Sequence, residues 1–178
     1  MTRPANSPPH TSSNPPSTDI ANLLRRERPA SAQHDIETFA RSLLFNWLIV
    51  GTDAHAKNYS VLLVGNQARL APLYDLGSGL LLGQHIRKLR LAMKVGGEYA
   101  PFKIERGHWL RLAADFGMNG ESLIESARKM AAALPDALLT ASHSPSVQAI
   151  ASPTPTRLID RIVEWCTSCS RVLNRKTT

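Results

Sequence analysis

Several residue types are scarce in this chain, and each shortage excludes a class of protein. Only two of the 178 residues are cysteine, Cys166 and Cys169, which is too few for a disulfide-stapled scaffold. No apolar run approaches the roughly 20 residues that cross a bilayer, and the beginning of the chain lacks the apolar segment of a secretory signal. What remains is 43% apolar and 20% charged, a globular composition. We therefore expect a cytoplasmic protein that makes no membrane contact.

Large apolar residues are missing from the first 18 positions. This segment holds five of the twelve prolines and no Leu, Ile, Val, Phe or Trp. Such a segment cannot bury enough apolar surface to offset the entropy lost on ordering. The sequence therefore predicts a disordered Pro/Ser-rich tail over residues 1–18 and one folded domain over residues 19–178.

The apolar spacing in residues 19–178 predicts a mainly helical domain with one small β-hairpin, an α+β fold. A Gly-spaced stretch and a segment over 86–95, either strand or irregular, separate the hairpin from the later helices. Gly51 is the expected stop of the second helix, and a Ser/Pro-rich loop is expected over 142–155. The expected helices cover about 19–27, 35–50, 105–116, 119–134 and 156–174, and the expected strands cover 59–64 and 68–73.

Polar side chains of catalytic types gather around the predicted hairpin. Gly51-Thr-Asp-Ala-His-Ala-Lys-Asn58 precedes it, and Leu73-Tyr-Asp75-Leu follows it. Because a hairpin brings its two ends together, Asn58 at the entry and Asp75 at the exit should be spatial neighbours. The sequence thus predicts one rim that holds two carboxylates, an amide, a histidine and a lysine.

Phosphoryl transfer needs residues of these types. One Asp accepts the proton of the attacking hydroxyl, and oxygen ligands hold Mg²⁺ between nucleotide phosphates. In protein kinases an Asp and an Asn five residues apart do this work with a later Asp, and Asp53, Asn58 and Asp75 reproduce that order. Taken singly, each is more simply a turn or cap residue. The complete set around an apolar hairpin favours the functional interpretation.

Two longer segments resemble the catalytic and metal-binding segments of HipA-like kinases, the Ser/Thr protein kinases of bacterial type II toxin–antitoxin modules. They are Phe45-Asn-Trp-Leu-Ile-Val-Gly-Thr-Asp-Ala-His-Ala-Lys-Asn-Tyr-Ser60 and Arg69-Leu-Ala-Pro-Leu-Tyr-Asp-Leu76. The segment Leu91–Glu98 and the helix with His108-Trp109 are similar to the downstream pattern of the family. The resemblance implies a protein-kinase-like C-terminal lobe over residues 19–178.

The resemblance also implies roles for individual residues. Asp53 matches the catalytic base, and Asn58 and Asp75 match the Mg²⁺ ligands. His55 and Lys57 become candidate catalytic and nucleotide-binding residues: His55 either faces the transferred phosphate or braces the loop, and Lys57 is otherwise a solvated loop residue. The implied cofactors are ATP and Mg²⁺. The implied partners are a translation-related protein that carries the accepting Ser or Thr, and a DNA-binding antitoxin.

Residues 1–50 do not contain the N-terminal kinase lobe that the resemblance calls for. HipA-like kinases are longer, and no Gly-x-Gly-x-x-Gly, Walker A or Val-Ala-Ile-Lys pattern occurs here. We therefore expect a truncated, C-lobe-only chain whose full activity requires a separate N-lobe chain. The rival hypothesis is a catalytically inactive remnant or binding module that keeps only its partner-facing surface.

Three other patterns are expected to be structural. Asp115-Phe116-Gly117 spells a kinase metal motif but falls at a predicted helix end, where Gly is a normal cap. Cys166-Thr-Ser-Cys169 is a lone pair inside a predicted helix, without the second pair of a zinc site.

The third pattern is a basic run with no acidic residue between Asp75 and Glu98. It could face a nucleotide, an acidic partner or antitoxin-bound DNA, but a solvated edge is favoured, in keeping with the formal charge of +7. No helix-turn-helix or aromatic–basic interleaving occurs, so we expect no direct sequence-specific binding of nucleic acid. The run consists of His85, Arg87, Lys88, Arg90 and Lys94.

Overall fold

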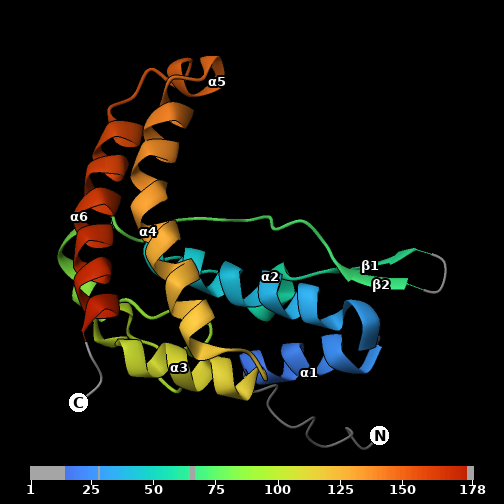
Figure 1. Ribbon diagram of the computed structural model, residues 1–178. Coiled ribbons are helices and arrows are strands. Elements are labelled where there is room, and N and C mark those ends of the chain that lie inside the picture. Colours follow the sequence, from blue (N-terminus) through green and yellow to red (C-terminus); the bar gives the residue numbers. More distant parts are fainter. Residues whose placement is uncertain (1–14, 28, 65–66, 176–178) are drawn as a thin grey trace, which may run out of the picture.

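The computed structural model describes residues 15–27, 29–64 and 67–175 and has two limbs (Figure 1). A lower limb of three helices extends into a two-stranded hairpin, and an upright pair of long helices rises from it. The lower limb comprises α1 (Ser17–Glu27), α2 (Pro29–Leu48), α3 (Arg106–Asp115), β1 (Val61–Val64) and β2 (Gln67–Leu70). The upright limb comprises α4 (Gly120–Ser142), α6 (Thr154–Asn174) and the short α5 (Pro145–Gln148) between them. Among the described residues this is the predicted mainly helical α+β fold.

Helix α2 is the centre of the core because its second half is apolar on nearly every side. Phe39, Leu44 and Trp47 are fully buried. The ring of Trp47 lies 5.3 Å from that of Trp109 on α3, and its indole nitrogen donates to the carbonyl of Pro101 at 3.0 Å. The C-terminal end of α2 is therefore held firmly where the chain enters the polar loop.

The upright limb is stabilised by the packing of α4 against α6. Apolar side chains recur on both helices at helical spacing, and Ile162 and Leu173 of α6 are buried against the core. The helix α4 continues through Pro135 to Ser142, eight residues beyond the predicted end at 134. A proline inside a helix removes one backbone hydrogen bond, and the contact with α6 compensates for that loss.

The hairpin projects from the lower limb and is tied to it by one ion pair. Its strands are antiparallel, with Val61 opposite Leu70 and Val64 opposite Gln67. Arg69 Nε lies 3.6 Å from Oδ1 of Asp35, a buried carboxylate on α2. Leu63 of β1 is 79% exposed. The hairpin is therefore attached to α2 near its base, where Leu70 packs against the core, while Leu62 and Leu63 are exposed.

Several sequence-based boundaries need correction. Of the two alternatives for 86–95, strand or irregular, the structure has the irregular one: a 3-10 helix, η2, covers Gly83–Lys88, and the rest is irregular apart from one bridge between Val95 and Glu98. Helix α2 begins at Pro29 instead of residue 35, and the loop expected over 142–155 contains α5. The disordered tail predicted over 1–18 is wrong at its end, because Ser17 and Thr18 lie in α1 and Ser17 is buried, while residues 1–14 lie outside the described residues.

No helix in the described part of the chain is both long and apolar enough to span a membrane.

Candidate active site

Helix α2 ends with a residue in the left-handed backbone conformation, which sets the direction of the polar loop that follows. The backbone of Val50 has φ +53°, and the amide of Gly51 donates to the carbonyl of Asn46 at 2.6 Å. A left-handed residue followed by such a bond is the usual way for a helix to end. The left-handed residue is Val50, whereas Gly51 is required because a Cβ there would lie 2.4 Å from Oδ1 of Asn46. The helix therefore ends where the sequence predicted, but Gly51 is needed for close packing against Asn46 and not for a left-handed backbone.

The loop after Gly51 folds back on Asp53. The backbone carbonyl of Asp53 accepts two hydrogen bonds at 2.7 Å, one from the backbone amide of His55 and one from Nδ2 of Asn58. Nε2 of His55 lies 3.2 Å from Oδ1 of Asp53. The Asp53 carboxylate is still 64% exposed. The loop therefore presents this carboxylate to solvent on a framework of hydrogen bonds.

Asn58 connects the two ends of the hairpin. It lies at the end of the 3-10 helix η1 (Ala56–Asn58) and is buried. The same Nδ2 that bonds to Asp53 also donates to Oδ2 of Asp75 at 3.1 Å. The structure therefore brings Asn58 and Asp75 together, as the hairpin argument predicted, and brings Asp53 to the same amide.

Asp75 has an unusual backbone conformation, with φ +55°. Asp tolerates this left-handed region better than most residues, at some cost in free energy. Neighbouring Tyr74 fixes the segment: its hydroxyl donates to the carbonyl of Lys57 at 2.9 Å and lies 3.0 Å from Oγ of Ser60. These contacts close the base of the hairpin beside Asp75.

A partly buried tyrosine, Tyr59, connects the loop to α2. The hydroxyl of Tyr59 accepts hydrogen bonds from Ser42 at 3.0 Å and from Nδ2 of Asn46 at 3.4 Å, both on α2. Burial raises the pKa of Tyr59 above its ordinary value, and these two hydrogen bonds oppose the rise. Tyr59 therefore remains a neutral phenol that connects the loop to α2.

The predicted site residues differ in how they are held. Asp53, His55, Asn58 and Asp75 form one connected set. Lys57 is exposed; its carbonyl is bonded to Tyr74, and its ammonium forms no ion pair with the described residues. Sequence reasoning missed Tyr74, Ser60 and Tyr59, because only a folded hairpin brings these side chains to their partners.

The donor set of the rim fits a hard divalent cation. Asp75 and Asn58 carry oxygen donors, the type that Mg²⁺ prefers, and Mg²⁺ is usually held by one or two carboxylates together with phosphates and water. Within the described part of the chain, no group of three His, Cys, Asp or Glu side chains could hold a metal ion. A cation held by Asp75 and Asn58 alone would need further oxygen ligands from outside the rim.

The two competing motifs bury their apolar and sulfur side chains in the core. Phe116 is 1% exposed and stacks on Phe39 with ring centroids 5.7 Å apart, and Gly117 ends α3 with φ +63°. Cys166 and Cys169 are free thiols buried on α6, and burial raises the pKa of Cys166 to about 11 and that of Cys169 further. Neither motif places its polar groups at the rim.

The fold and the site together define a helical lobe with a polar rim beside a hairpin. Comparisons with known proteins identify the family to which this lobe belongs. The family model described as the HipA-like C-terminal domain matches residues 7–138. The chain belongs to this HipA-like C-terminal domain family.

The chain is also similar to a protein of related sequence and to a solved structure of the same fold. It is 31% identical over 102 residues, 56% of its length, to a Sinorhizobium fredii protein called "Putative kinase Y4mE". It also shares its fold with a chain from the HipA, HipB and operator DNA complex of the Shewanella oneidensis MR-1 toxin–antitoxin system, with a TM-score of 0.69, 19% identity and 92% of this chain covered. The chain spans only 23% of the length of the first relative and 38% of the second.

Proposed function

We propose that this chain is the catalytic C-terminal lobe of a HipA-like kinase that transfers the γ-phosphoryl group of ATP to a Ser or Thr of a protein. The observation that carries the proposal is the position of Asn58, whose side-chain amide donates both to the backbone carbonyl of Asp53 and to the Asp75 carboxylate. Family membership supports the same assignment.

Asp53 acts as the general base in this proposal. Its exposed carboxylate takes the proton of the Ser or Thr hydroxyl while the hydroxyl oxygen forms a bond to the γ-phosphorus. The bond from phosphorus to the β–γ bridging oxygen breaks, and ADP leaves. His55, 3.2 Å from Oδ1, orients the carboxylate toward the acceptor. The contact with Asp53 favours the bracing role for His55 over a direct role at the phosphate.

Asn58 and Asp75 would hold Mg²⁺ at the end of the hairpin. When bound, the cation neutralises charge on the nucleotide phosphates. Asn58 Nδ2 is already committed to Asp53 and Asp75, which leaves the amide oxygen as the metal-facing atom. Lys57, exposed beside them, would contact the nucleotide.

Phosphoryl transfer depends mainly on positioning, so half of a nucleotide cleft should give little activity. We therefore propose that a second chain or domain supplies the N-terminal lobe. The proposed partners are a DNA-binding antitoxin and a translation-related acceptor protein, and the proposed location is the cytoplasm.

The test follows labelled phosphate from ATP into protein Ser or Thr, with this chain co-purified with the product of the neighbouring gene. Asp53→Asn should lower transfer by about 100-fold or more, because a general base alone contributes at least that much. Asp75→Asn should also lower transfer, because a proposed Mg²⁺ ligand is lost. Asp115→Asn is the matched control, since this exposed aspartate lies in the competing motif, and it should leave transfer unchanged.

Undiminished transfer by Asp53→Asn would refute the assignment of the base. Calorimetry with Mg-ATP separates the rival hypothesis: if neither the chain nor its complex binds Mg-ATP, the chain is a binding module and the kinase proposal is wrong.

A further inference from the structure

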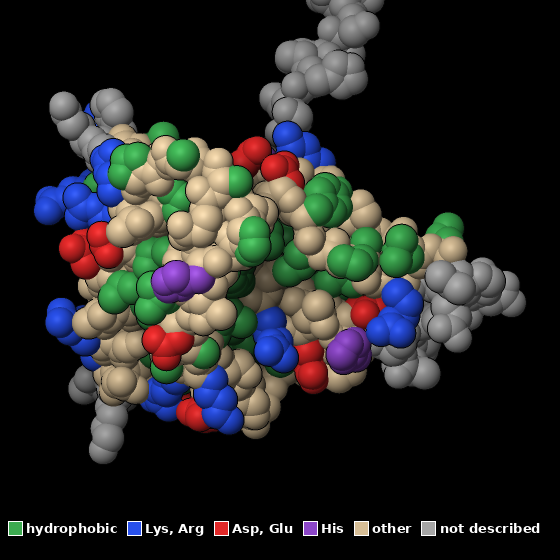
Figure 2. All heavy atoms as spheres, turned by 90° about the horizontal axis from the view of Figure 1, so that it is seen from above, with side chains coloured by type: hydrophobic (Ala, Val, Ile, Leu, Met, Phe, Trp, Pro, Cys, Tyr) green, Lys and Arg blue, Asp and Glu red, His purple; other side chains and the backbone are tan. Residues whose placement is uncertain are grey.

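An apolar groove runs along the inner angle between the two limbs. It has two adjoining parts of about 360 and 500 Å³ that share Arg41, Phe45 and Met130. Figure 2 shows hydrophobic side chains gathered around a hollow in the face seen from above. Cavities of several hundred Å³ are of the size that binds specific ligands. The other lining residues are Thr38 and Ser42 of α2, Leu73 and Leu76 beyond β2, and Ser126, Lys129, Ala133, Leu134 and Ala137 of α4.

The charge of the groove has one sign. Its lining contains two cations, Arg41 and Lys129, and no Asp or Glu. Lys129 lies 3.8 Å from Glu125, whereas Arg41 forms no ion pair with any residue that the structure describes. A cation over apolar walls attracts a ligand that is itself apolar and carries a carboxylate.

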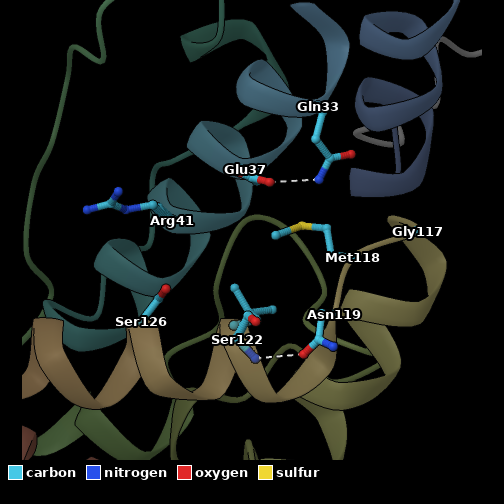
Figure 3. Close-up of a pocket in the computed structure, with 9 residues that line it drawn as sticks. Gln33, Glu37, Arg41, Gly117, Met118, Asn119, Ser122 and Ser126 are labelled. Atoms are coloured by element: carbon cyan, nitrogen blue, oxygen red, sulfur yellow. Dashed lines mark hydrogen bonds between the residues drawn. The ribbon is translucent and has the colours of Figure 1, made fainter. Parts of the chain in front are cut away.

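A third cavity, of about 300 Å³, shows which way Arg41 points (Figure 3). It lies between α2 and the start of α4, where Gln33 donates to Glu37 at 2.7 Å. In Figure 3 the Arg41 side chain extends away from this Gln33–Glu37 pair. Arg41 therefore forms no ion pair with Glu37, and its positive charge lies at the wall of the apolar groove.

The groove is also long enough for a peptide segment. Its α4 wall runs from Ser126 to Ala137, about 16 Å at the helical rise, which matches about five residues of extended chain. The opposite wall includes Leu73 and Leu76, which flank Tyr74 and Asp75. A segment bound here would thus lie beside the rim of the candidate active site.

We propose that this groove docks an apolar segment of a partner protein, with an acidic side chain of that segment paired to Arg41. The pairing of apolar walls with an uncompensated cation argues for this occupant. The docking function stands on the groove and its charge, and it does not require the chain to transfer phosphate.

The first test is a selection of random 12-residue peptides, displayed on phage, against the purified full-length chain. The enriched peptides should combine large apolar residues with Asp or Glu. Selection against Arg41→Glu should lose this acidic preference and shift it toward Lys or Arg. Basic or purely polar peptides from the wild type, or no enrichment, would overturn the proposal.

The second test measures the affinity of the most enriched peptide by fluorescence anisotropy. Arg41→Glu should weaken binding roughly ten-fold or more, as expected for loss of a charge-assisted bond. The matched control is Arg157→Glu, because Arg157 is an exposed cation on α6 that lines none of these cavities. It should bind as the wild type does.

The apolar walls are tested separately with Ala133→Gln and Ala137→Gln, two exposed helical positions where glutamine is tolerated and fills the groove. Each should weaken the same peptide while far-ultraviolet circular dichroism stays unchanged. Unaltered binding by both would overturn the proposal. Sedimentation gives the remaining outcome: a dimer at micromolar concentration that Ala133→Gln dissociates would assign the groove to a second copy of the chain instead.

Discussion

Two kinds of motif occur in this chain, and they differ in which way their side chains face. The loop at 53–58 and Asp75 present polar groups at a rim between a helix end and a hairpin. The other kind of motif lies on helices and faces the core. Phe116 is buried at the end of α3, and both thiols of the cysteine pair are buried on α6. The comparison shows that the backbone around a short motif decides whether its polar side chains are exposed and able to react. A loop after the buried helix α2 exposes the carboxylate of Asp53, while the residues at the end of α3 cap the helix and pack in the core.

The largest expected effect is on the core side of this comparison. Phe116→Ala should lower the free energy of unfolding by about 3–5 kcal/mol, because a fully buried ring that stacks on Phe39 is lost. Leu76→Ala, at the corresponding position after Asp75, should cost less than about 1 kcal/mol since Leu76 is 44% exposed. Urea denaturation followed by circular dichroism measures both. Equal losses of unfolding free energy in the two variants would contradict the difference between the core motif and the rim.

A smaller effect is expected at the end of α3. Gly117→Ala should cost about 1–2 kcal/mol, because φ is +63° and an L side chain is strained there. Space is not the cause, since the nearest atom to an added Cβ is Nη2 of Arg25 at 3.6 Å. The same denaturation series gives the value. A neutral or stabilising result would contradict the role of Gly117 as a structural cap.

The buried thiols predict a modest dependence of stability on pH. Burial raises the pKa of Cys166 to about 11 and that of Cys169 further, while an unfolded thiol ionises near 8.5. Between these values the unfolded chain releases protons that the folded chain keeps, so stability should fall as the pH rises from about 8.5 to 11. Urea midpoints at pH 7.5 and 10 measure the slope. A variant with Cys166→Ala and Cys169→Ala should show a shallower slope, and an equal slope would contradict the prediction.

The smallest effect is expected at the rim. Asp53→Asn should change the free energy of unfolding by no more than about 0.5 kcal/mol, because the carboxylate is 64% exposed and exposed ion pairs contribute little. Thermal denaturation checks this. A loss of several kcal/mol would mean that the loop carbonyl network, and with it the core, depends on the Asp53 side chain.

The sequence was informative wherever local chemistry decides the outcome. The α3 end at Phe116 and Gly117, the Asn119 cap of α4 and the antiparallel hairpin were all predictable from short-range patterns. The pairing of Asn58 with Asp75 followed from the hairpin alone.

The remaining features depend on contacts between distant residues. Helix α4 passes Pro135 because α6 packs along it, which no local propensity for helix ending reveals. The contacts of Tyr74 with Lys57 and of Tyr59 with Ser42 span 17 residues each. The groove at Arg41 is formed by three segments that are far apart in the sequence: α2, residues 73–76 and α4. Such features arise from tertiary packing, so periodicity and capping could not predict them.

The indole nitrogen of Trp165 donates to the backbone carbonyl of Trp47 at 2.9 Å, across 118 residues of sequence. The acceptor lies four residues before Gly51, so α6 helps to hold the end of α2 from which the loop at 53–58 departs. Contacts this far apart in sequence form late, because a long loop must close before they are gained. During synthesis this one bond can form only after α6 has left the ribosome, whereas the bonds of Trp47 to Pro101 and of Asn58 to Asp53 need only earlier residues.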